Sequence, residues 1–370
     1  MKIAFIGGRD IHTLGGIETY MYHLCSELVE RGYQPIVYCE SDHIGVEYVN
    51  GFKVVHWVSP KSIYVCKIWL GLRSTLHALF REKNVRVFHY NAWPPSLWSW
   101  IPRLMGRTSV MMGHGLEWKH TKYSSWQKKL MRFMERWTAY TNTHLIMCSD
   151  VQTAYFKEKY GRKCITVPGA IDLPDLLQIP HSGILARYAL SPRKYFLYLG
   201  RLSKEKNPDY LIRAFLKGHM GDFKLVIAGA NDTAPDYVQS LHSLAANSSD
   251  IVFTGAVYGE EKACLLYNCM AFCIPSTTEG LSIALLEAMS YAKPVIASDI
   301  DANKEALGDI SANLWVKAED EDSLSRQIVY CVEHVPEMEK VGLLNRKRAE
   351  DFYTWDKTTK KYIDYVNSII

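Results

Sequence analysis

Two successive series of short, continuously apolar segments restrict the fold of this 370-residue chain more than any other feature. Most of these segments lack the alternation of apolar and polar residues found in a strand with one face in solvent. Strands that are apolar throughout suit a parallel sheet covered on both faces. The first series comprises 2–6, 35–39, 52–56, 85–90, 108–112 and 144–148, and the second comprises 195–199, 224–228, 250–254, 271–274 and 294–297.

Helical patterns lie between the apolar segments. Within 17–29, for example, apolar residues recur at helical spacing, and Gly32 marks the end of the helix. Strands that alternate with helices in two series predict an α/β protein with two doubly wound domains. The break falls near 170–192, which is rich in proline and glycine. We therefore expect one domain over 1–180 and a second over 190–350.

The composition narrows the class of protein. A formal net charge of +4 is too small to favour nucleic acid as the main partner. No stretch reaches the roughly 20 apolar residues of a membrane span. Many of the nine cysteines lie in apolar runs, and the closest group, at 264–273, lacks the spacing of a zinc site. We expect a cytoplasmic protein with reduced cysteines.

Two candidate phosphate-binding segments follow apolar strands. Gly15 and Gly16 open the first helix, where a close backbone approach and free N–H groups suit an anion. The sequence GRLSKEKNP follows 195–199 and places Arg201 and Lys206 five residues apart, beyond the end of a strand. Cations at that edge suit a diphosphate. An ordinary loop and a solvated basic loop are the alternatives.

A third candidate segment runs from Glu279 to Glu287. Here the strand 271–274 leads into a loop and then into a helix that begins near Ser282. The backbone N–H groups of Gly280, Leu281 and Ser282 would cap this helix and face an anion. Glu287 lies inside the apolar helix, where a carboxylate is costly unless it is paired or bound. The alternative is a salt-bridged Glu287 with an exposed Glu279.

His114 is a fourth candidate. It is flanked by Gly113 and Gly115 directly after the strand 108–112, which leaves its side chain sterically open. A histidine in this place can bind a sugar hydroxyl or stabilise a developing charge. The alternative is a loop histidine without a role.

Together these residues resemble those of glycosyltransferase family 4, a retaining family with the GT-B fold. The resemblance covers nearly the whole chain, and its most specific part is the segment from Glu279 to Glu287. It implies two doubly wound, Rossmann-like domains that face each other across a cleft, with 351–370 packing back on the first domain. It also implies a hexosyltransferase that moves a sugar from a nucleotide diphosphate to an acceptor and needs no metal or other cofactor.

The resemblance also assigns roles to individual residues. Glu287 would hold the ribose hydroxyls, Glu279 the donor sugar, and the backbone at Val257 would lie near the base. The catalytic residues would be His114, Arg201, Lys206 and Glu279. The residues that bind the nucleotide sugar would be Gly15, Gly16, Val257, Gly280, Leu281, Ser282 and Glu287.

A narrower likeness concerns the donor sugar. The segments GGIETYMYHLCSELVERG and HGLEWKHTKY are similar to those of rhamnosyltransferases that build bacterial surface polysaccharides. His120 and Tyr123 stand where these enzymes tend to have Arg and Trp. We favour rhamnose from dTDP-rhamnose, transferred to a glycan or a lipid-linked oligosaccharide. A GDP- or UDP-linked mannose, glucose or galactose is the alternative.

The sequence contains no evident enzymic nucleophile. We therefore expect front-face attack, with the leaving phosphate accepting the proton of the acceptor and the protein acting by positioning and charge stabilisation. The two D-x-D triplets, at 299–301 and 320–322, fit a metal site poorly, because one follows a strand of the second domain and the other lies in an acidic run. We expect no role for a divalent metal.

The segment 117–137 is a basic amphipathic helix by its pattern, with aromatic residues among its cations. Such helices lie on anionic membranes, so we expect a peripheral contact at the inner face of the cytoplasmic membrane. A surface helix with its apolar side in the domain core is the alternative. The cations are Lys119, Lys122, Lys128, Lys129, Arg132 and Arg136.

Other classes of protein are weakened by missing motifs. A dinucleotide-dependent enzyme would show G-x-G-x-x-G, which is absent. A GT-B phosphorylase would need a marked pyridoxal lysine. A non-catalytic GT-B binding protein is the remaining alternative, and the presence of Arg201, Lys206, Glu279 and Glu287 argues against it.

Overall fold

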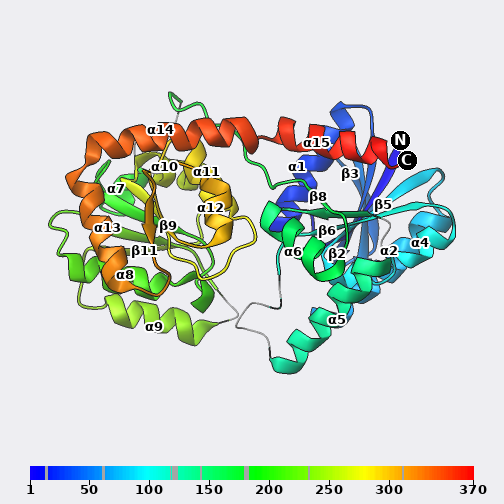
Figure 1. Cartoon of the computed structure of the whole chain (residues 1–370), viewed down its shortest axis with the longest axis horizontal. Helices are drawn as coiled ribbons and strands as arrows, with labels where there is room; N and C mark the ends of the chain where they lie inside the picture. Colours follow the sequence, from blue (N-terminus) through cyan, green and yellow to red (C-terminus); the bar gives the residue numbers. More distant parts are fainter. Residues whose placement is uncertain are drawn as a thin grey trace. The chain divides into compact units, whose positions relative to one another are not determined.

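The computed structural model describes residues 1–12, 16–60, 63–116, 118, 124–141, 144–178, 183–231, 234–310 and 312–370. The chain forms two compact units, shown in Figure 1. Unit 1 comprises Met1–Ala170 and Trp355–Ile370, and unit 2 comprises Ile171–Thr354. The first boundary therefore lies ten residues before the expected residue 180. Ile171 is already tied to the end of unit 2, since its N–H donates to the carbonyl of Tyr353 at 2.8 Å.

Unit 1 contains a sheet of eight strands in the order β3-β4-β2-β1-β5-β6-β7-β8. All neighbours are parallel except β3, which pairs antiparallel with β4. The strands are β1 (Lys2–Gly8), β2 (Gln34–Ser41), β3 (Gly45–Val49), β4 (Phe52–Val58), β5 (Val85–Asn91), β6 (Thr108–Gly113), β7 (His144–Met147) and β8 (Ile165–Thr166).

The helices of unit 1 include the last one of the chain. They are α1 (Gly16–Glu30), α2 (Ile63–Phe80), α3 (Trp93–Ser96), α4 (Trp100–Leu104), α5 (Ser125–Thr141), α6 (Asp150–Tyr160) and α15 (Trp355–Ser368). Gly32 has a φ of 80° and ends α1 as expected, with its N–H donating to the carbonyl of Val29. The helix α15 packs against α1, where the Trp355 ring stacks on His23 at 4.8 Å.

Unit 2 contains a parallel sheet of six strands in the order β11-β10-β9-β12-β13-β14. The strands are β9 (Tyr195–Leu199), β10 (Lys224–Ala228), β11 (Ile251–Gly255), β12 (Ala271–Ile274), β13 (Val295–Ser298) and β14 (Leu314–Val316). The helices are α7 (Ile184–Arg187), the 3₁₀ helix η2 (Lys204–Lys206), α8 (Pro208–Gly218), α9 (Pro235–Ala245), α10 (Gly259–Asn268), α11 (Ile283–Ser290), α12 (Asp301–Leu307), α13 (Glu321–Glu333) and α14 (Val335–Phe352).

Both faces of the sheet in unit 2 are buried. Tyr195 and Leu197 of β9 belong to one apolar cluster, whereas Phe196 and Tyr198 of the same strand belong to a second cluster. Helix α11 covers the first face, and helices α8 and α13 cover the second. The absence of alternation in these strands follows from this double coverage. The predicted α/β architecture with two Rossmann-like domains is confirmed.

Each of the eleven predicted strands is present, with ends shifted by at most two residues, and three further strands of the described chain were missed. The edge strand β3 has an alternating exposure pattern, because its residues Val46 and Tyr48 face solvent. The strands β8 and β14 have only two and three residues, too few to form a recognisable apolar run. Among the described helices, none is long and apolar enough to cross a membrane.

The order of the strands places a topological switch point in each unit. In unit 2, the chain leaves β9 on one side for β10 and β11 and occupies the other side with β12, β13 and β14. In unit 1, β1 lies between β2 and β5 in the same way. Open α/β sheets bind ligands at the carboxyl ends of the strands where this reversal occurs. We therefore expect a ligand site at the loops after β9 and β12 or at the loops after β1 and β5.

Candidate active site

The loop after β9 is held in a fixed shape at the switch point of unit 2. The backbones of its first residue, Gly200, and of Gly229 after β10 are in close contact, since a Cβ on Gly229 would collide with the Gly200 oxygen. At the other end of the loop, Asn207 has a left-handed φ of 53° and precedes α8. Its buried side chain donates to the carbonyl of Pro275 at 3.0 Å.

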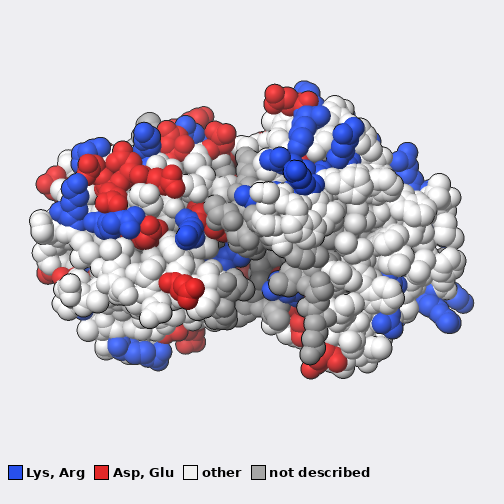
Figure 2. All heavy atoms as spheres, turned by 90° about the horizontal axis from the view of Figure 1, so that it is seen from below, with Lys and Arg blue, Asp and Glu red and all other residues white. Residues whose placement is uncertain are grey.

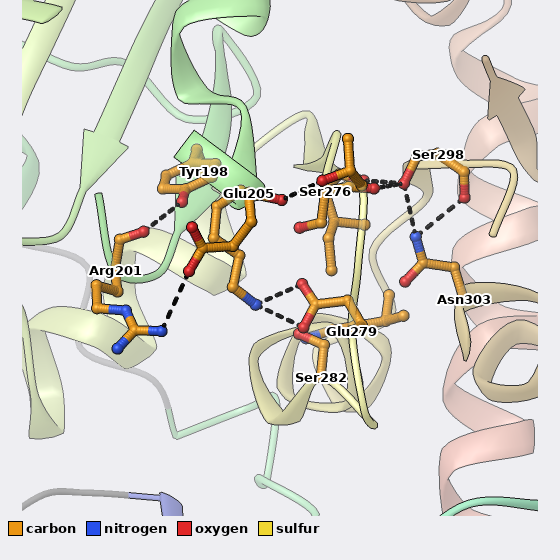
Figure 3. A network of polar contacts seen from close by, with 12 residues as sticks. Tyr198, Arg201, Glu205, Ser276, Glu279, Ser282, Ser298 and Asn303 are labelled. Atoms are coloured by element: carbon orange, nitrogen blue, oxygen red, sulfur yellow. Dashed lines mark hydrogen bonds and ion pairs between the residues drawn. The ribbon is translucent and has the colours of Figure 1, made fainter. Parts of the chain in front are cut away.

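The loop after β12 is attached to the loop after β9 by further hydrogen bonds. The backbone N–H of Thr277 donates to the carbonyl of Glu205 at 2.9 Å, and the Thr277 hydroxyl donates to the same oxygen at 3.2 Å. Figure 3 shows the two loops side by side with Arg201, Glu205 and Glu279 between them. The structure thus brings together two of the segments that the sequence singled out.

Lys206 and Glu279 meet across these loops. The Lys206 ammonium donates to both carboxylate oxygens of Glu279 at 2.5 Å. The side chain of Glu279 is 6% exposed and that of Lys206 is 21% exposed. The expected alternative of an exposed Glu279 is therefore wrong. A charged pair removed from most of the solvent interacts more strongly than a surface pair.

Arg201 lies on the same loop and remains more open to solvent. Its guanidinium pairs with Glu205 at 3.5 Å, and its carbonyl accepts from the buried Tyr198 hydroxyl at 2.9 Å. Glu205 is buried, and sequence reasoning did not select it. Its position between Lys204 and Lys206 in the basic motif was the available signal. Glu205 restrains the Arg201 side chain and anchors the loop after β12.

The start of α11 provides backbone donors beside this pair. Ser282 is the N-cap and accepts from the Leu285 N–H, as the sequence predicted for a helix beginning near this residue. Within the described part of the chain, the backbone N–H groups of Gly280, Leu281 and Ser282 make no hydrogen bond. These three donors and the positive end of the helix favour an anion at this place.

Glu287 is paired inside α11. Its carboxylate accepts from Lys262 of α10 at 2.5 Å, so the expected alternative of a salt-bridged Glu287 applies to this residue. Sequence reasoning missed Lys262, which lies four residues after Tyr258. The Val257 side chain is buried in the core, so only the backbone of Val257 is left to face a ligand.

A buried hydrogen-bond network supports the loop after β12. The Ser298 hydroxyl bonds to the carbonyl oxygens of Ile274 and Ser276, and Asn303 donates to the Ser298 hydroxyl at 3.0 Å (Figure 3). The hydroxyls of Ser203 and Ser276 are buried and have no partner among the described residues. Such unpaired hydroxyls are available to a ligand or to water.

A cavity of about 810 Å³ lies beside the same edge of the sheet. It extends between the ends of β10 and β11 and the helix α9. The His242 and Phe253 rings form part of its wall, with centroids 4.0 Å apart. A flat apolar ligand fits such a wall. The lining residues are Leu202, Gly229, Ala230, Asn231, Pro235, Val238, Gln239, His242, Phe253, Thr254 and Gly255.

The first helix of unit 1 begins at the switch point of its own sheet. Gly16 is the first residue of α1, and a Cβ there would meet no atom within 4 Å, so the helix start is open. The buried carboxylate of Glu18 accepts from the N–H of Arg9 at 2.8 Å and shapes the loop. Gly15 lies outside the described residues.

His114 is held by Asn91 at the ends of the neighbouring strands β6 and β5. The Nε2 atom of His114 lies 3.0 Å from the Asn91 Oδ1 atom, which only accepts, so Nε2 carries the proton and Nδ1 remains an acceptor. Burial lowers the pKa of His114 to about 4. The ring is therefore neutral at pH 7. Hydrogen bonding of the neutral ring to a sugar hydroxyl or to a developing charge stays a prediction.

The described residues contain no group of three His, Cys, Asp or Glu side chains that could hold a metal. In each D-x-D triplet, at least one carboxylate has another partner. Asp320 caps α13 by accepting from the Ser323 N–H at 2.9 Å, and Asp299 pairs with Lys304. These contacts assign structural roles to both carboxylates.

Comparisons with known proteins relate both halves of the chain to glycosyltransferases. The sequence model of Glycosyltransferase Family 4 matches residues 14–174, and that of Glycosyl transferases group 1 matches residues 187–347. A phosphatidyl-myo-inositol mannosyltransferase of Mycobacterium leprae is 26% identical over 89% of this chain and 87% of its own length. An uncharacterized glycosyltransferase of Methanocaldococcus jannaschii is 30% identical over 46% of this chain, and the match spans only 44% of that protein.

Solved structures share the whole fold. The Anabaena protein HepE, solved in complex with UDP and glucose, has a TM-score of 0.81 and 16% identity, with all of both chains covered. The fold and the family models together define a glycosyltransferase of the GT-B type. More narrowly, the two matched segments, one in each half of the chain, support a family 4 glycosyltransferase.

Proposed function

We propose that this enzyme transfers a hexose or deoxyhexose, with retention of configuration, from a nucleotide diphosphate to a glycan or lipid-linked acceptor. One observation carries the proposal. Two cations, Arg201 and Lys206, lie at the switch point of unit 2, where Glu279 and the free N–H groups at the start of α11 also lie. A diphosphate fits these cations and donors, and Glu279 can accept from sugar hydroxyls.

The remaining parts of the donor have candidate places in the same unit. The aromatic wall of the cavity beside β10 and β11, or the backbone at Val257, suits the base, and Glu287 suits the ribose hydroxyls. The presence of UDP and glucose in the HepE complex supports a nucleotide sugar as the ligand class.

Two donor sugars are candidates. Rhamnose from dTDP-rhamnose is favoured by the N-terminal sequence likeness to rhamnosyltransferases. Mannose is the second candidate, because the Mycobacterium leprae relative is named a mannosyltransferase. That name also includes a phosphatidylinositol acceptor, which supports a lipid-linked acceptor and a peripheral contact with the membrane.

The chemistry requires no enzymic nucleophile. The bond between the anomeric carbon and the phosphate oxygen breaks, and the acceptor oxygen bonds to the same face of that carbon. The acceptor proton passes to the leaving phosphate oxygen. Arg201 and Lys206 stabilise the charge that grows on the diphosphate. His114 is proposed to orient a sugar hydroxyl through its free Nδ1 atom, and no divalent metal takes part.

The test is a panel of nucleotide sugars without metal, in the presence of a chelator. Isothermal calorimetry measures binding of dTDP-rhamnose, GDP-mannose, UDP-glucose and UDP-galactose to the wild type, Lys206→Ala and Lys204→Ala. Lys204 lies on the same loop but is exposed, so Lys204→Ala is the control for the loss of one positive charge. Selective binding of one donor that weakens at least tenfold in Lys206→Ala alone is the expected result.

Other outcomes would change the proposal at defined points. Equal weakening in both lysine variants would reduce the role of Lys206 to general electrostatics and contradict the site. Binding of GDP-mannose alone would replace rhamnose by mannose. If binding and turnover appear only after Mg²⁺ is added, metal independence is wrong.

A further inference from the structure

Helix α5 presents two different faces. Its inner face packs into unit 1 through Met131, Met134, Glu135, Thr138 and Ala139. The Glu135 carboxylate is completely buried and is held by four donors. These are the Trp118 indole at 2.7 Å, the Tyr155 hydroxyl at 2.9 Å, the Tyr160 hydroxyl at 2.5 Å and the Lys159 ammonium at 3.0 Å.

The attachment of α5 to unit 1 therefore rests mainly on residues other than its aromatic ones. All four aromatic residues of α5 are largely exposed: Trp126 by 62%, Phe133 by 58%, Tyr140 by 50% and Trp137 by 42%. They recur at helical spacing along one side of the helix. The expected alternative, an apolar face in the core, thus accounts for the methionines but leaves an aromatic stripe in solvent.

Cations share the exposed side with these aromatic residues. Lys129, Arg132 and Arg136 are exposed, and the one acidic residue of α5, Glu135, is buried on the inner face. Apart from Ser125 at the start of the helix, the exposed residues of α5 are therefore all cationic or aromatic. Figure 2 views the molecule from below, the side on which α5 lies in Figure 1, and unit 1 there shows groups of Lys and Arg around a broad uncharged surface.

The neighbouring helix α4 adds to this surface. The Trp137 indole donates to the carbonyl of Leu97 at 3.2 Å, which places the end of α5 against the segment that leads into α4. Within and just after α4, Leu104 is 78% exposed and Met105 is 49% exposed, and both are flanked by the exposed Arg103 and Arg107. The surface of exposed apolar and cationic side chains on α5 thus continues onto α4.

We infer that the exposed side of α5, extended by α4, docks on a phospholipid membrane with anionic headgroups. Tryptophan and tyrosine favour the interfacial layer of a bilayer, while lysine and arginine pair with lipid phosphates and anionic headgroups. A protein partner would be expected to leave fewer cations in the centre of its docking surface. The inference deepens the membrane contact in the proposed function and is independent of the donor site.

The structure also determines which residues test the inference. Lys128 is half-buried, and the Arg132 guanidinium stacks on Trp118 at 4.5 Å, so neither is a clean target. Lys129 and Arg136 are exposed on the outer side, as are Trp126 and Phe133. We choose Lys129→Glu/Arg136→Glu for charge and Trp126→Ser/Phe133→Ser for apolar insertion.

The experiment is flotation with phosphatidylcholine vesicles, with and without phosphatidylglycerol. The control Lys83→Glu/Arg86→Glu reverses the same number of exposed cations on another part of unit 1, and Tyr48→Ser removes an exposed aromatic ring from β3. We expect the wild type and both controls to bind only the anionic vesicles. Both α5 variants should bind at least about tenfold more weakly.

Two results would overturn the inference: absence of wild-type binding to anionic vesicles, or equal loss in the α5 variants and their controls. The inference is also overturned if the α5 side binds a soluble protein while the wild type does not bind anionic vesicles. Calorimetry with the nucleotide sugar is run on the same variants. Unchanged donor binding separates a failure of the docking surface from a failure of the donor site.

Discussion

At the scale of single residues, the contact between Lys206 and Glu279 bears directly on the proposed donor site. The pair is formed across 73 residues of sequence and is mostly removed from solvent. In the proposed donor site, an incoming diphosphate would compete with Glu279 for the Lys206 ammonium group. The donor sugar, in contrast, would offer hydroxyls that can donate to the Glu279 carboxylate. Under this proposal, Glu279 opposes binding of the phosphate part of the ligand and favours binding of the sugar part.

This conflict predicts opposite effects of one substitution on two ligands. Glu279→Gln removes the competing charge, so the free nucleoside diphosphate should bind about threefold to tenfold more tightly. Sugar transfer should fall about a hundredfold, because the contact to the donor sugar is weakened. Calorimetry with the nucleoside diphosphate and initial rates with the sugar donor measure the two effects. Weaker binding of both ligands would contradict the competition.

The sequence predicted these residues individually but not their partners. Arg201, Lys206 and Glu279 stand in motifs whose position after a strand can be recognised. Glu205 was missed because its burial cannot be read from a basic motif, and Lys262 was missed because its pairing with Glu287 depends on the packing of two helices. The neutral state of His114 was missed for the same reason, since its pKa depends on burial that one sequence does not show.

At the scale of elements, the ends of neighbouring strands set the chemistry of His114. Asn91 is the last residue of β5, and His114 follows β6 directly, so the parallel pairing of these strands brings the two side chains together. Asn91 thereby selects the tautomer with Nδ1 free. A positioning role of this kind does not require Asn91 to touch the substrate.

The contact between Asn91 and His114 predicts that Asn91→Asp changes the pH dependence of kcat. A carboxylate beside the ring raises the pKa of His114 from about 4 and makes the protonated form accessible near pH 6. The acidic limb of the kcat profile should therefore move to higher pH, and NMR titration of the His114 ring protons should show the same shift. A matched Asn91→Leu variant lacks the charge and should lower kcat without moving the limb. An unshifted limb in Asn91→Asp would exclude the positioning role.

At the same scale, the central strands of each sheet were easier to predict than the edge strands. Central strands such as β9 and β12 are buried on both faces and read as continuous apolar runs. The edge strand β3 and the very short β8 and β14 carry too little burial for such a signal. The start of α11 was predicted from Ser282, whose capping role is local and therefore visible in sequence.

At the scale of the whole molecule, a buried histidine links stability to pH. His89 lies in β5 with no exposed surface, its Nδ1 atom is 3.0 Å from the Tyr362 hydroxyl, and burial lowers its pKa to about 3. Above pH 6.5 the ring is neutral in both states. As the pH falls from 6.5 towards 3, only the unfolded state gains the proton, so the stability of the folded state decreases.

The expected size of this effect is about 1.4 kcal/mol per pH unit within that window. Urea unfolding of the wild type and of His89→Gln, at about pH 7 and about pH 5, measures it. The wild type should lose about 2 kcal/mol more than the variant between the two conditions. Equal losses in both proteins would show that His89 is not the group responsible. Carboxylates that titrate in both proteins cancel in the comparison.

The hydrogen bond between His89 and Tyr362 also has a consequence for folding during protein synthesis. Unit 2 is one continuous stretch of chain, whereas unit 1 needs α15 from the far end, with Trp355 and Tyr362 in its core. On the ribosome, the unit that is started first is therefore the last to be completed. Until its final helix emerges, the nascent chain carries an open face over β1 and β5, the kind of surface that chaperones bind.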